Sequence, residues 1–251
     1  MKRKEFLIGF LLIFILTSGR LSNVSAVNYG IGVKQNEGLI WKCKVCNKVE
    51  MENIFGSEWD SSGIFTNLSK GANMKWKINS TEINSTIISI EYDIWYWNLG
   101  EEWGIKDNSS QITIFVDPDD YSTNYWFLNY TSLVPFLLPI PVGEYLGDLS
   151  VNLNDFYDVD NRVLPTLNVE VLKDNISPGY PNKDLKIIAI YNDRGILNSY
   201  KLYGKENTVI IDIALDFLPI YVIPSLIGLM VVFSIGVAFY IIKKKYPSNK
   251  K

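Results

Sequence analysis

Residues 185–214 read LKIIAIYNDRGILNSYKLYGKENTVIIDIA, and this stretch predicts the fold more directly than any other part of the chain. Three apolar runs lie in it: Leu185–Tyr191, Ile196–Tyr203 and Thr208–Ala214. The separators, residues 192–195 and 204–207, have the composition of tight turns, with Gly195 at the positive-φ position of a bulged hairpin. We therefore expect a three-stranded antiparallel meander.

An alternation of apolar and polar residues with a period of two recurs upstream and indicates further half-buried strands. We expect these strands at residues 39–46, 74–79, 88–97, 111–116, 124–130 and 163–172, with short helices at 50–56 and 142–149. Strand and helix do not alternate as in a parallel sheet. The predicted fold class is therefore mainly β: an antiparallel curved sheet, a sandwich or a partly open barrel, plus a C-terminal transmembrane helix.

The N-terminus has the pattern of a secretory signal peptide. Residues 2–4 are basic, residues 6–17 are uncharged and apolar, and Val24-Ser25-Ala26 is a small-residue cleavage site. A helix of twelve residues rises about 18 Å, which is short of the roughly 30 Å of hydrocarbon in a bilayer. We predict cleavage after Ala26, and an uncleaved N-terminal anchor is the alternative.

The C-terminus predicts a single membrane span. No charged residue occurs in 217–242, and residues 224–242 would form about 28 Å of helix. Residues 243–245 are all lysine, which places the C-terminus in the cytoplasm by the positive-inside rule. The expected organisation is: signal peptide 1–26, extracytoplasmic β-rich domain 27–218, transmembrane helix 219–242 and basic cytoplasmic tail 243–251.

A second uncharged stretch, residues 121–143, contains Pro135, Pro139 and Pro141, which would break a membrane helix. We interpret it as a strand leading into a Pro-rich apolar loop. Residues 133–142 then either fill the core or form a surface that covers an apolar ligand or dips into the membrane.

Composition excludes several functions. The chain has no histidine, which rules out imidazole catalysis and zinc sites that contain histidine. Residues 27–242 carry 15 Lys or Arg and 26 Asp or Glu, and this net charge of −11 argues against nucleic-acid binding. The acidic runs at 117–120 and 155–160 lack the EF-hand glycine and glutamate, so we interpret them as solvated loops and expect neither metal nor cofactor.

The only two cysteines, Cys43 and Cys46, lie in a predicted strand, where positions three apart face opposite ways. Redox catalysis of the thioredoxin type would need a helix N-terminus instead. A disulfide between Cys43 and Cys46 requires the strand to bend at residues 44–45, and both thiol and disulfide states remain open.

Aromatic and acidic side chains alternate along one predicted strand. Glu91, Asp93, Trp95 and Trp97 are expected to share one face of this strand, a mixture typical of surfaces that bind sugars or protein partners. The alternative is that the tryptophans pack beneath a covering loop.

Six N-x-Ser/Thr sequons are candidate glycosylation sites, and all of them lie within residues 27–218. They begin at Asn67, Asn79, Asn84, Asn108, Asn129 and Asn175.

Four segments together resemble archaeal cell-surface proteins of the "choice-of-anchor S" type. The segments are 39–41 (LIW), 53–59 (NIFGSEW), 71–78 (GANMKWKI) and 92–97 (YDIWYW). The resemblance implies a leader, an outer β-rich domain without known activity and a C-terminal anchor. The cysteine pair is not part of that pattern.

The sequence thus predicts a single-pass membrane-anchored cell-surface protein with a non-catalytic binding or envelope-structural β domain. Its partners would be a cell-surface protein, a glycan or a lipid. One alternative is a membrane-proximal carrier or sensor of an apolar ligand with residues 133–142 as its lid. A further alternative is an extracytoplasmic carbohydrate-active enzyme, which needs two facing carboxylates about 5–10 Å apart.

Overall fold

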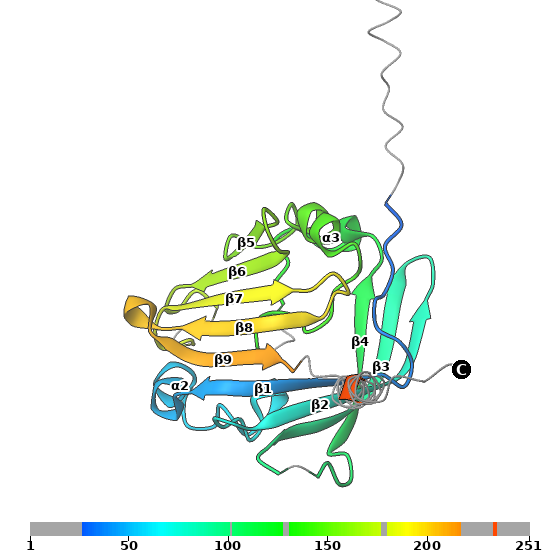
Figure 1. Cartoon of the computed structure of the whole chain (residues 1–251). Coiled ribbons are helices and arrows are strands. Elements are labelled where there is room, and N and C mark those ends of the chain that lie inside the picture. Colours follow the sequence, from blue (N-terminus) through cyan, green and yellow to red (C-terminus); the bar gives the residue numbers. More distant parts are fainter. Residues whose placement is uncertain (1–26, 101, 128–130, 177–179, 217–232, 235–251) are drawn as a thin grey trace, which may run out of the picture.

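The structure is a computed structural model that describes residues 27–100, 102–127, 131–176, 180–216 and 233–234. These residues form one open antiparallel sheet of nine strands with two α-helices (Figure 1). The strands are β1 (Gly38–Cys46), β2 (Asn73–Ile83), β3 (Ile87–Asn98), β4 (Asn108–Phe115), β5 (Tyr157–Asp160), β6 (Thr166–Val171), β7 (Leu185–Tyr191), β8 (Leu197–Tyr203) and β9 (Val209–Leu215). The helices are α2 (Lys48–Phe55) and α3 (Val142–Leu149).

The strands follow the order β4-β3-β2-β1-β9-β8-β7-β6-β5. Each strand pairs with its neighbours in antiparallel orientation. The predicted meander is confirmed as β7-β8-β9, and both short helices form where they were expected. The first and last strands, β1 and β9, pair in the middle and join two blocks of sequential strands. Figure 1 shows that β3 and β4 run in a very different direction from β7–β9, so the sheet is strongly twisted.

One face of the sheet, here called the inner face, carries the apolar side chains of the alternating strands. On β1 and β2, Trp41 and Trp76 are at most 2% exposed. Phe136 packs edge-on against Trp41, with 5.1 Å between the ring centroids, and lies 5.3 Å from the ring of Trp76. The polar residues between these positions face the opposite, outer face, as the period of two predicts.

The Pro-rich stretch is part of the core. Val134, Phe136, Leu137 and Leu138 are all at most 1% exposed. The backbone of this stretch is bonded on both sides like a short strand: the Leu138 N–H donates to the Gly195 carbonyl at 2.8 Å, and the Ile140 N–H donates to that of Gly30 at 3.0 Å. Of the two interpretations of residues 133–142, core filling is therefore confirmed.

The expected strand at residues 124–130 is wrong for its described part, 124–127. Only a single bridge forms there, between Tyr125 and Leu153, because the aromatic rings of Tyr125 and Phe127 pack inside a local aromatic cluster. Conversely, β5 is a strand that the sequence did not predict, since its four residues carry two aspartates.

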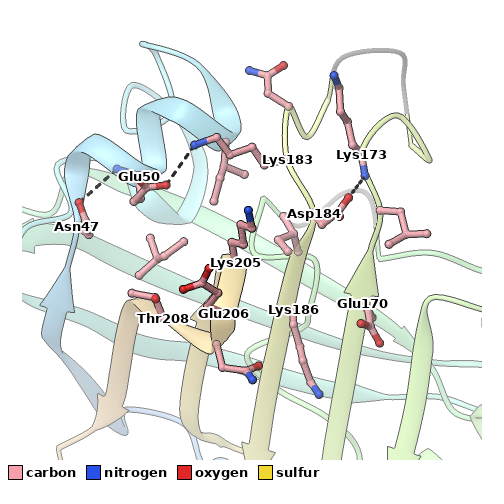
Figure 2. Close-up of a pocket in the computed structure, with 17 residues that line it drawn as sticks. Asn47, Glu50, Glu170, Lys173, Lys183, Asp184, Lys186, Lys205, Glu206 and Thr208 are labelled. Carbon is pink, nitrogen blue, oxygen red and sulfur yellow. Dashed lines mark hydrogen bonds and ion pairs between the residues drawn. The ribbon is translucent and has the colours of Figure 1, made fainter.

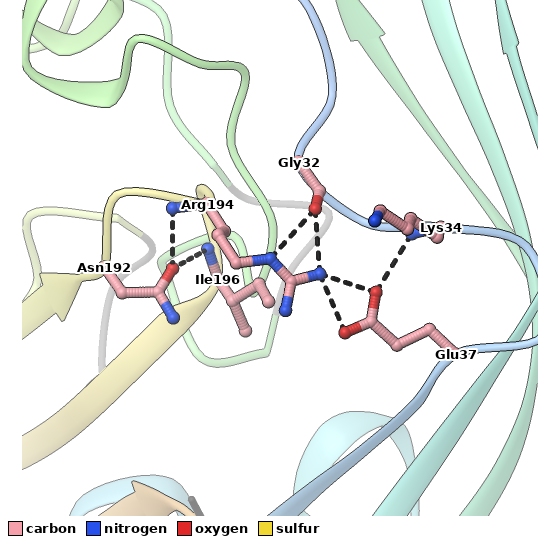
Figure 3. Close-up of polar contacts among 6 residues, drawn as sticks. All are labelled: Gly32, Lys34, Glu37, Asn192, Arg194 and Ile196. Carbon is pink, nitrogen blue, oxygen red and sulfur yellow. Dashed lines mark hydrogen bonds and ion pairs between the residues drawn. The ribbon is translucent and has the colours of Figure 1, made fainter.

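The β7–β8 turn contacts both the Pro-rich stretch, through Gly195, and the N-terminal segment, through Arg194. Figure 3 shows the contacts of Arg194. The Arg194 guanidinium donates to the Gly32 carbonyl at 2.8 and 3.1 Å and to the Glu37 carboxylate at 2.6 and 2.7 Å. Gly195 adopts φ +74°, as predicted, and a Cβ there would lie 2.0 Å from the Leu138 carbonyl oxygen. The turn therefore needs glycine both for its backbone angle and for its close approach to Leu138.

The predicted signal peptide, residues 1–26, lies outside the described residues, and so does the predicted transmembrane helix, residues 219–242, apart from residues 233–234. Within the part of the chain that is described, no helix has the length and apolar character required to cross a bilayer.

Candidate functional site

The strand that carries the predicted binding surface contains a β-bulge. Asn98 pairs with Asn73, but Trp95 pairs with Lys75, so that β3 has one more residue than β2 in this interval. The additional residue reverses the alternation, and Trp97 turns to the inner face, where it is 2% exposed. Its indole N–H donates to the Ile64 carbonyl at 2.7 Å. The expectation that Trp97 shares a face with Trp95 is therefore wrong.

The other three residues of the predicted surface remain on the outer face. Asp93 is the most highly bonded of them: it accepts from Lys106 Nζ at 2.7 Å, from Ser109 Oγ at 2.7 Å and from Asn79 Nδ2 at 2.9 Å. These hydrogen bonds, with that from Lys106 the strongest, lower the pKa of Asp93 to about 2. Neighbouring Glu91 accepts from Ser80 Oγ at 2.9 Å.

Trp95 is held by contacts that the sequence did not predict. The Lys75 ammonium lies 4.7 Å from the centre of the Trp95 ring and 5.4 Å from that of Trp103. The Trp95 indole N–H donates to the Gly104 carbonyl at 3.2 Å. The loop between β3 and β4 therefore folds over Trp95, as in the alternative interpretation of a covering loop.

We call this array the outer polar surface. It consists of Lys75, Glu91, Asp93, Trp95, Trp103 and Lys106. The contribution of Lys75 depends on the pairing register of β2 and β3, which places it directly opposite Trp95. Partial burial, and then the charge of Lys77, lowers the pKa of Lys75. Lys75 already contacts the faces of the Trp95 and Trp103 rings, so these rings are less suited to stacking against a ligand. The array is therefore chemically suited to recognise a partner through hydrogen bonds and charge.

The cysteines are brought to one side of β1 by another bulge. Cys43 pairs with Ile213 and Cys46 with Ile211, with a register shift after Cys43, and both isoleucines face the core. The bend that a disulfide requires is therefore present, although both thiols are free. A hydrogen bond from Cys43 lowers the pKa of Cys46, whereas the same contact together with burial raises the pKa of Cys43.

The sequons occupy accessible positions. Asn67, Asn84, Asn108 and Asn175 are exposed, and Asn79 is partly exposed on the outer face, where its amide donates to Asp93. Asn129 lies outside the described residues. Glycosylation at these asparagines stays a prediction.

A cleft of about 1010 Å³ lies elsewhere, between α2, the β8–β9 turn and the adjoining ends of β6 and β7 (Figure 2). Positive and negative side chains line it in equal number: Lys173, Lys183, Lys186 and Lys205, and Glu50, Glu170, Asp184 and Glu206. Lys183 lies 3.4 Å from Glu50, and Asp184 accepts the backbone N–H of Lys173 at 2.8 Å. Sequence reasoning missed this cleft because its lining comes from four separate segments.

The acidic runs serve local structure where the chain is described. Asp117 accepts the backbone N–H of Asp119 at 3.0 Å and caps a short turn, and Asp160 forms an ion pair with Arg162 at 2.7 Å. Within the described residues, no group of three or more cysteine or acidic side chains is arranged to hold a metal ion.

Comparison of the chain with protein-family models, with curated proteins and with solved structures found no match.

Proposed function

We propose that this chain is a cell-surface protein, anchored in the membrane by its C-terminal segment, whose sheet domain contacts neighbouring molecules of the envelope without catalysing a reaction. The charge distribution at the two ends of the sequence supports the location. The resemblance to choice-of-anchor S surface proteins supports it as well.

One observation carries the proposed contact role: the chain fills its own inner face and leaves an ordered polar array on the outer face. Phe136 occupies the space beside Trp41 and Trp76 where an apolar ligand would have to bind, and Val134 and Leu137 of the same stretch are fully buried. The outer polar surface, by contrast, presents charged groups whose positions are fixed by the bonds of Asp93. A preorganised polar surface loses little side-chain entropy on binding a partner.

This packing weighs against the apolar carrier. A lid at residues 133–142 would have to break the Leu138–Gly195 and Ile140–Gly30 hydrogen bonds and expose Phe136 to water on opening. The charged cleft supports a second candidate, the binding of a polar ligand that carries both signs of charge, because its lysines and carboxylates are equal in number.

Two treatments of cells that express the full chain test the location. Intact cells are treated with proteinase K, and their membranes are extracted with alkaline carbonate. We expect cleavage of the sheet domain from outside and retention of the chain in the carbonate-washed membrane. The matched control ends at Asp216 and is expected in the medium. A full chain that is protected in intact cells, or released by carbonate, would contradict the proposal.

The contact role is tested on the same cells by amine-reactive cross-linking with and without Lys106→Met. That substitution removes the cation beside Asp93. We expect loss of the cross-linked species. Lys201→Met, which removes an outer-face cation on β8 that lies 3.7 Å from Asp212 on β9, should retain it. Equal cross-linking of both variants would contradict this role for the outer polar surface.

A further inference from the structure

The sheet is open, and β4 is one of its two edges. β4 pairs with β3 through eight consecutive residues, from Asn108 opposite Ile94 to Phe115 opposite Ile87, without a bulge. It borders the outer polar surface, because Asp93 pairs with Ser109.

Alternate residues of β4 direct their backbone groups away from β3. The Val116 N–H donates to the Thr86 carbonyl at 2.9 Å, so even-numbered positions are the ones that bond to β3 in this antiparallel ladder. Odd-numbered positions therefore face the edge. Phe115 agrees with this. Its N–H donates to the Tyr121 hydroxyl at 3.4 Å instead of to a strand, and its carbonyl accepts from the Tyr145 hydroxyl at 2.9 Å.

Three further odd-numbered residues of β4 face the edge: Ser109, Gln111 and Thr113. The Ser109 N–H donates to the Asn108 side chain at 2.8 Å. The other edge-facing N–H and carbonyl groups of these three residues have no hydrogen-bond partner among the described residues. All three are exposed. Edges of this kind pair readily with another strand unless charge, proline, a bulge or shortness prevents it. β4 has none of these protections in its sequence NSSQITIF.

The opposite edge is protected. β5 has only four residues, two of which are aspartates, and Asp160 is held by Arg162 at its end. The contrast indicates that β4 is an edge suited to pairing and β5 an edge that resists it.

We propose that two copies of this chain associate by antiparallel pairing of their β4 strands about a two-fold axis through Gln111. In this register Gln111 lies opposite its own copy and Ser109 lies opposite Thr113. All three uncovered residues then pair, with about six backbone hydrogen bonds between the strands. The neutral amide and hydroxyl side chains on the outer face are compatible with themselves, which is what pairing between identical strands requires.

Electrostatics permits this arrangement although the chain is acidic. Asp107 and Asp117 flank β4 and fall outside the paired residues 109–113. Within the sheet, the acidic residues nearest the axis are Glu91 and Asp93 on β3, so the equivalent groups of two copies would be three strand spacings, or ~14 Å, apart. That exceeds the screening length of ~8 Å at physiological ionic strength. This inference rests on the proposed function in taking the β2–β4 end of the sheet as the contact surface, and it names the partner as a second copy.

The test uses the full chain in detergent solution, produced in a bacterial host that adds no glycan to Asn108, and measures the monomer–dimer equilibrium by sedimentation. Gln111→Lys and Gln111→Glu each place like charges opposite one another across the axis. We expect each variant alone to dimerise roughly fivefold more weakly than the wild type, and an equimolar mixture to recover dimer formation. Ser199→Lys, which adds a charge on the outer face of the interior strand β8 and away from β4, is the matched control and should dimerise like the wild type.

A wild-type chain that remains monomeric at all concentrations would overturn the proposal, as would dimers that are equally strong in both Gln111 variants. Circular dichroism shows whether each variant is folded. Mixing Gln111→Lys with Gln111→Glu keeps the test decisive, because only pairing at Gln111 predicts that the mixture recovers dimer formation. Failure here leaves the cell-surface location untouched, since the protease experiment tests that separately.

Discussion

The two faces of the same sheet are completed in opposite ways. On the inner face, Phe136 comes from a distant loop and packs against Trp41 of β1 and Trp76 of β2, which are almost completely buried. On the outer face, the side chains of Asp93 and Trp95 are held by the β3–β4 loop and by the neighbouring strands, and they remain partly exposed. The inner face therefore depends on packing by a distant apolar segment, and the outer face on polar and cation–π contacts between adjacent elements.

This difference predicts which substitutions should change the stability of the domain and which should change its contacts with other molecules. Removing a buried aromatic ring leaves a cavity, whereas removing an accessible ion pair changes stability little. Predictions that address the two faces separately should show large and small effects respectively.

The largest effect is expected from Phe136→Ala. Loss of its contacts with Trp41 and Trp76 should lower the free energy of unfolding by about 3–5 kcal/mol, measured by denaturant titration with tryptophan fluorescence. Ile105→Ala, at a side chain that is 93% exposed, is the control and should change stability by less than about 0.5 kcal/mol. Similar values for the two would mean that the inner face is not packed as described.

Gly195→Ala should have the next largest effect. The new Cβ would meet the Leu138 carbonyl, in addition to the backbone strain of roughly 1–3 kcal/mol at positive φ. Gly104→Ala is a close control, because Gly104 also has a positive φ, +49°, and nothing within 4 Å of its Cβ position. Thermal unfolding measures the loss of stability in each variant. The additional loss in Gly195→Ala reports how tightly the turn packs against the Pro-rich stretch. Equal losses in the two variants would contradict the close approach of Gly195 to the Leu138 carbonyl.

On the outer face, acid should weaken the fold through Asp93. Its pKa is lowered to about 2 from an ordinary value of about 4, so the stabilisation is complete above pH ~4 and is lost as the pH falls toward 2. Asp93→Asn should remove this part of the pH dependence between pH 4 and 2. An unchanged acid profile in the variant would show that Lys106, Ser109 and Asn79 do not stabilise the Asp93 carboxylate.

The smallest structural effect concerns the thiols of β1. Iodoacetamide should label Cys46 before Cys43, since Cys46 is partly exposed and has the lower pKa, whereas Cys43 is fully buried. Peptide mass spectrometry after brief labelling measures the order. Preferential labelling of Cys43, or none at either site until the disulfide is reduced, would contradict free thiols in this arrangement.

Local patterns in the sequence were sufficient for most elements. The apolar runs of 185–214 and the turn glycine at 195 predicted the meander, because strand alternation and positive φ are properties of neighbouring residues. The two bulges were not predictable in this way. A bulge results from a mismatch between paired strands, so the positions of Trp97 and Cys46 depend on partners far away in sequence.

The candidate site was predictable only in part for the same reason. Asp93 and Trp95 were found because they alternate within one strand. Lys75 and Lys106 reach them only through the register of β2 with β3 and the fold of the β3–β4 loop. The charged cleft and the pairing order of the sheet are likewise products of tertiary structure.

Hydrogen exchange of the full chain tests most directly the claim that the inner face is closed by its own Pro-rich stretch. We predict that the amides of Leu138 and Ile140, which donate to Gly195 and Gly30, exchange as slowly as the paired amides of β7 and β8. Exchange as fast as in the exposed loop at residues 104–106 would contradict the claim, because it would mean that the stretch opens as a lid.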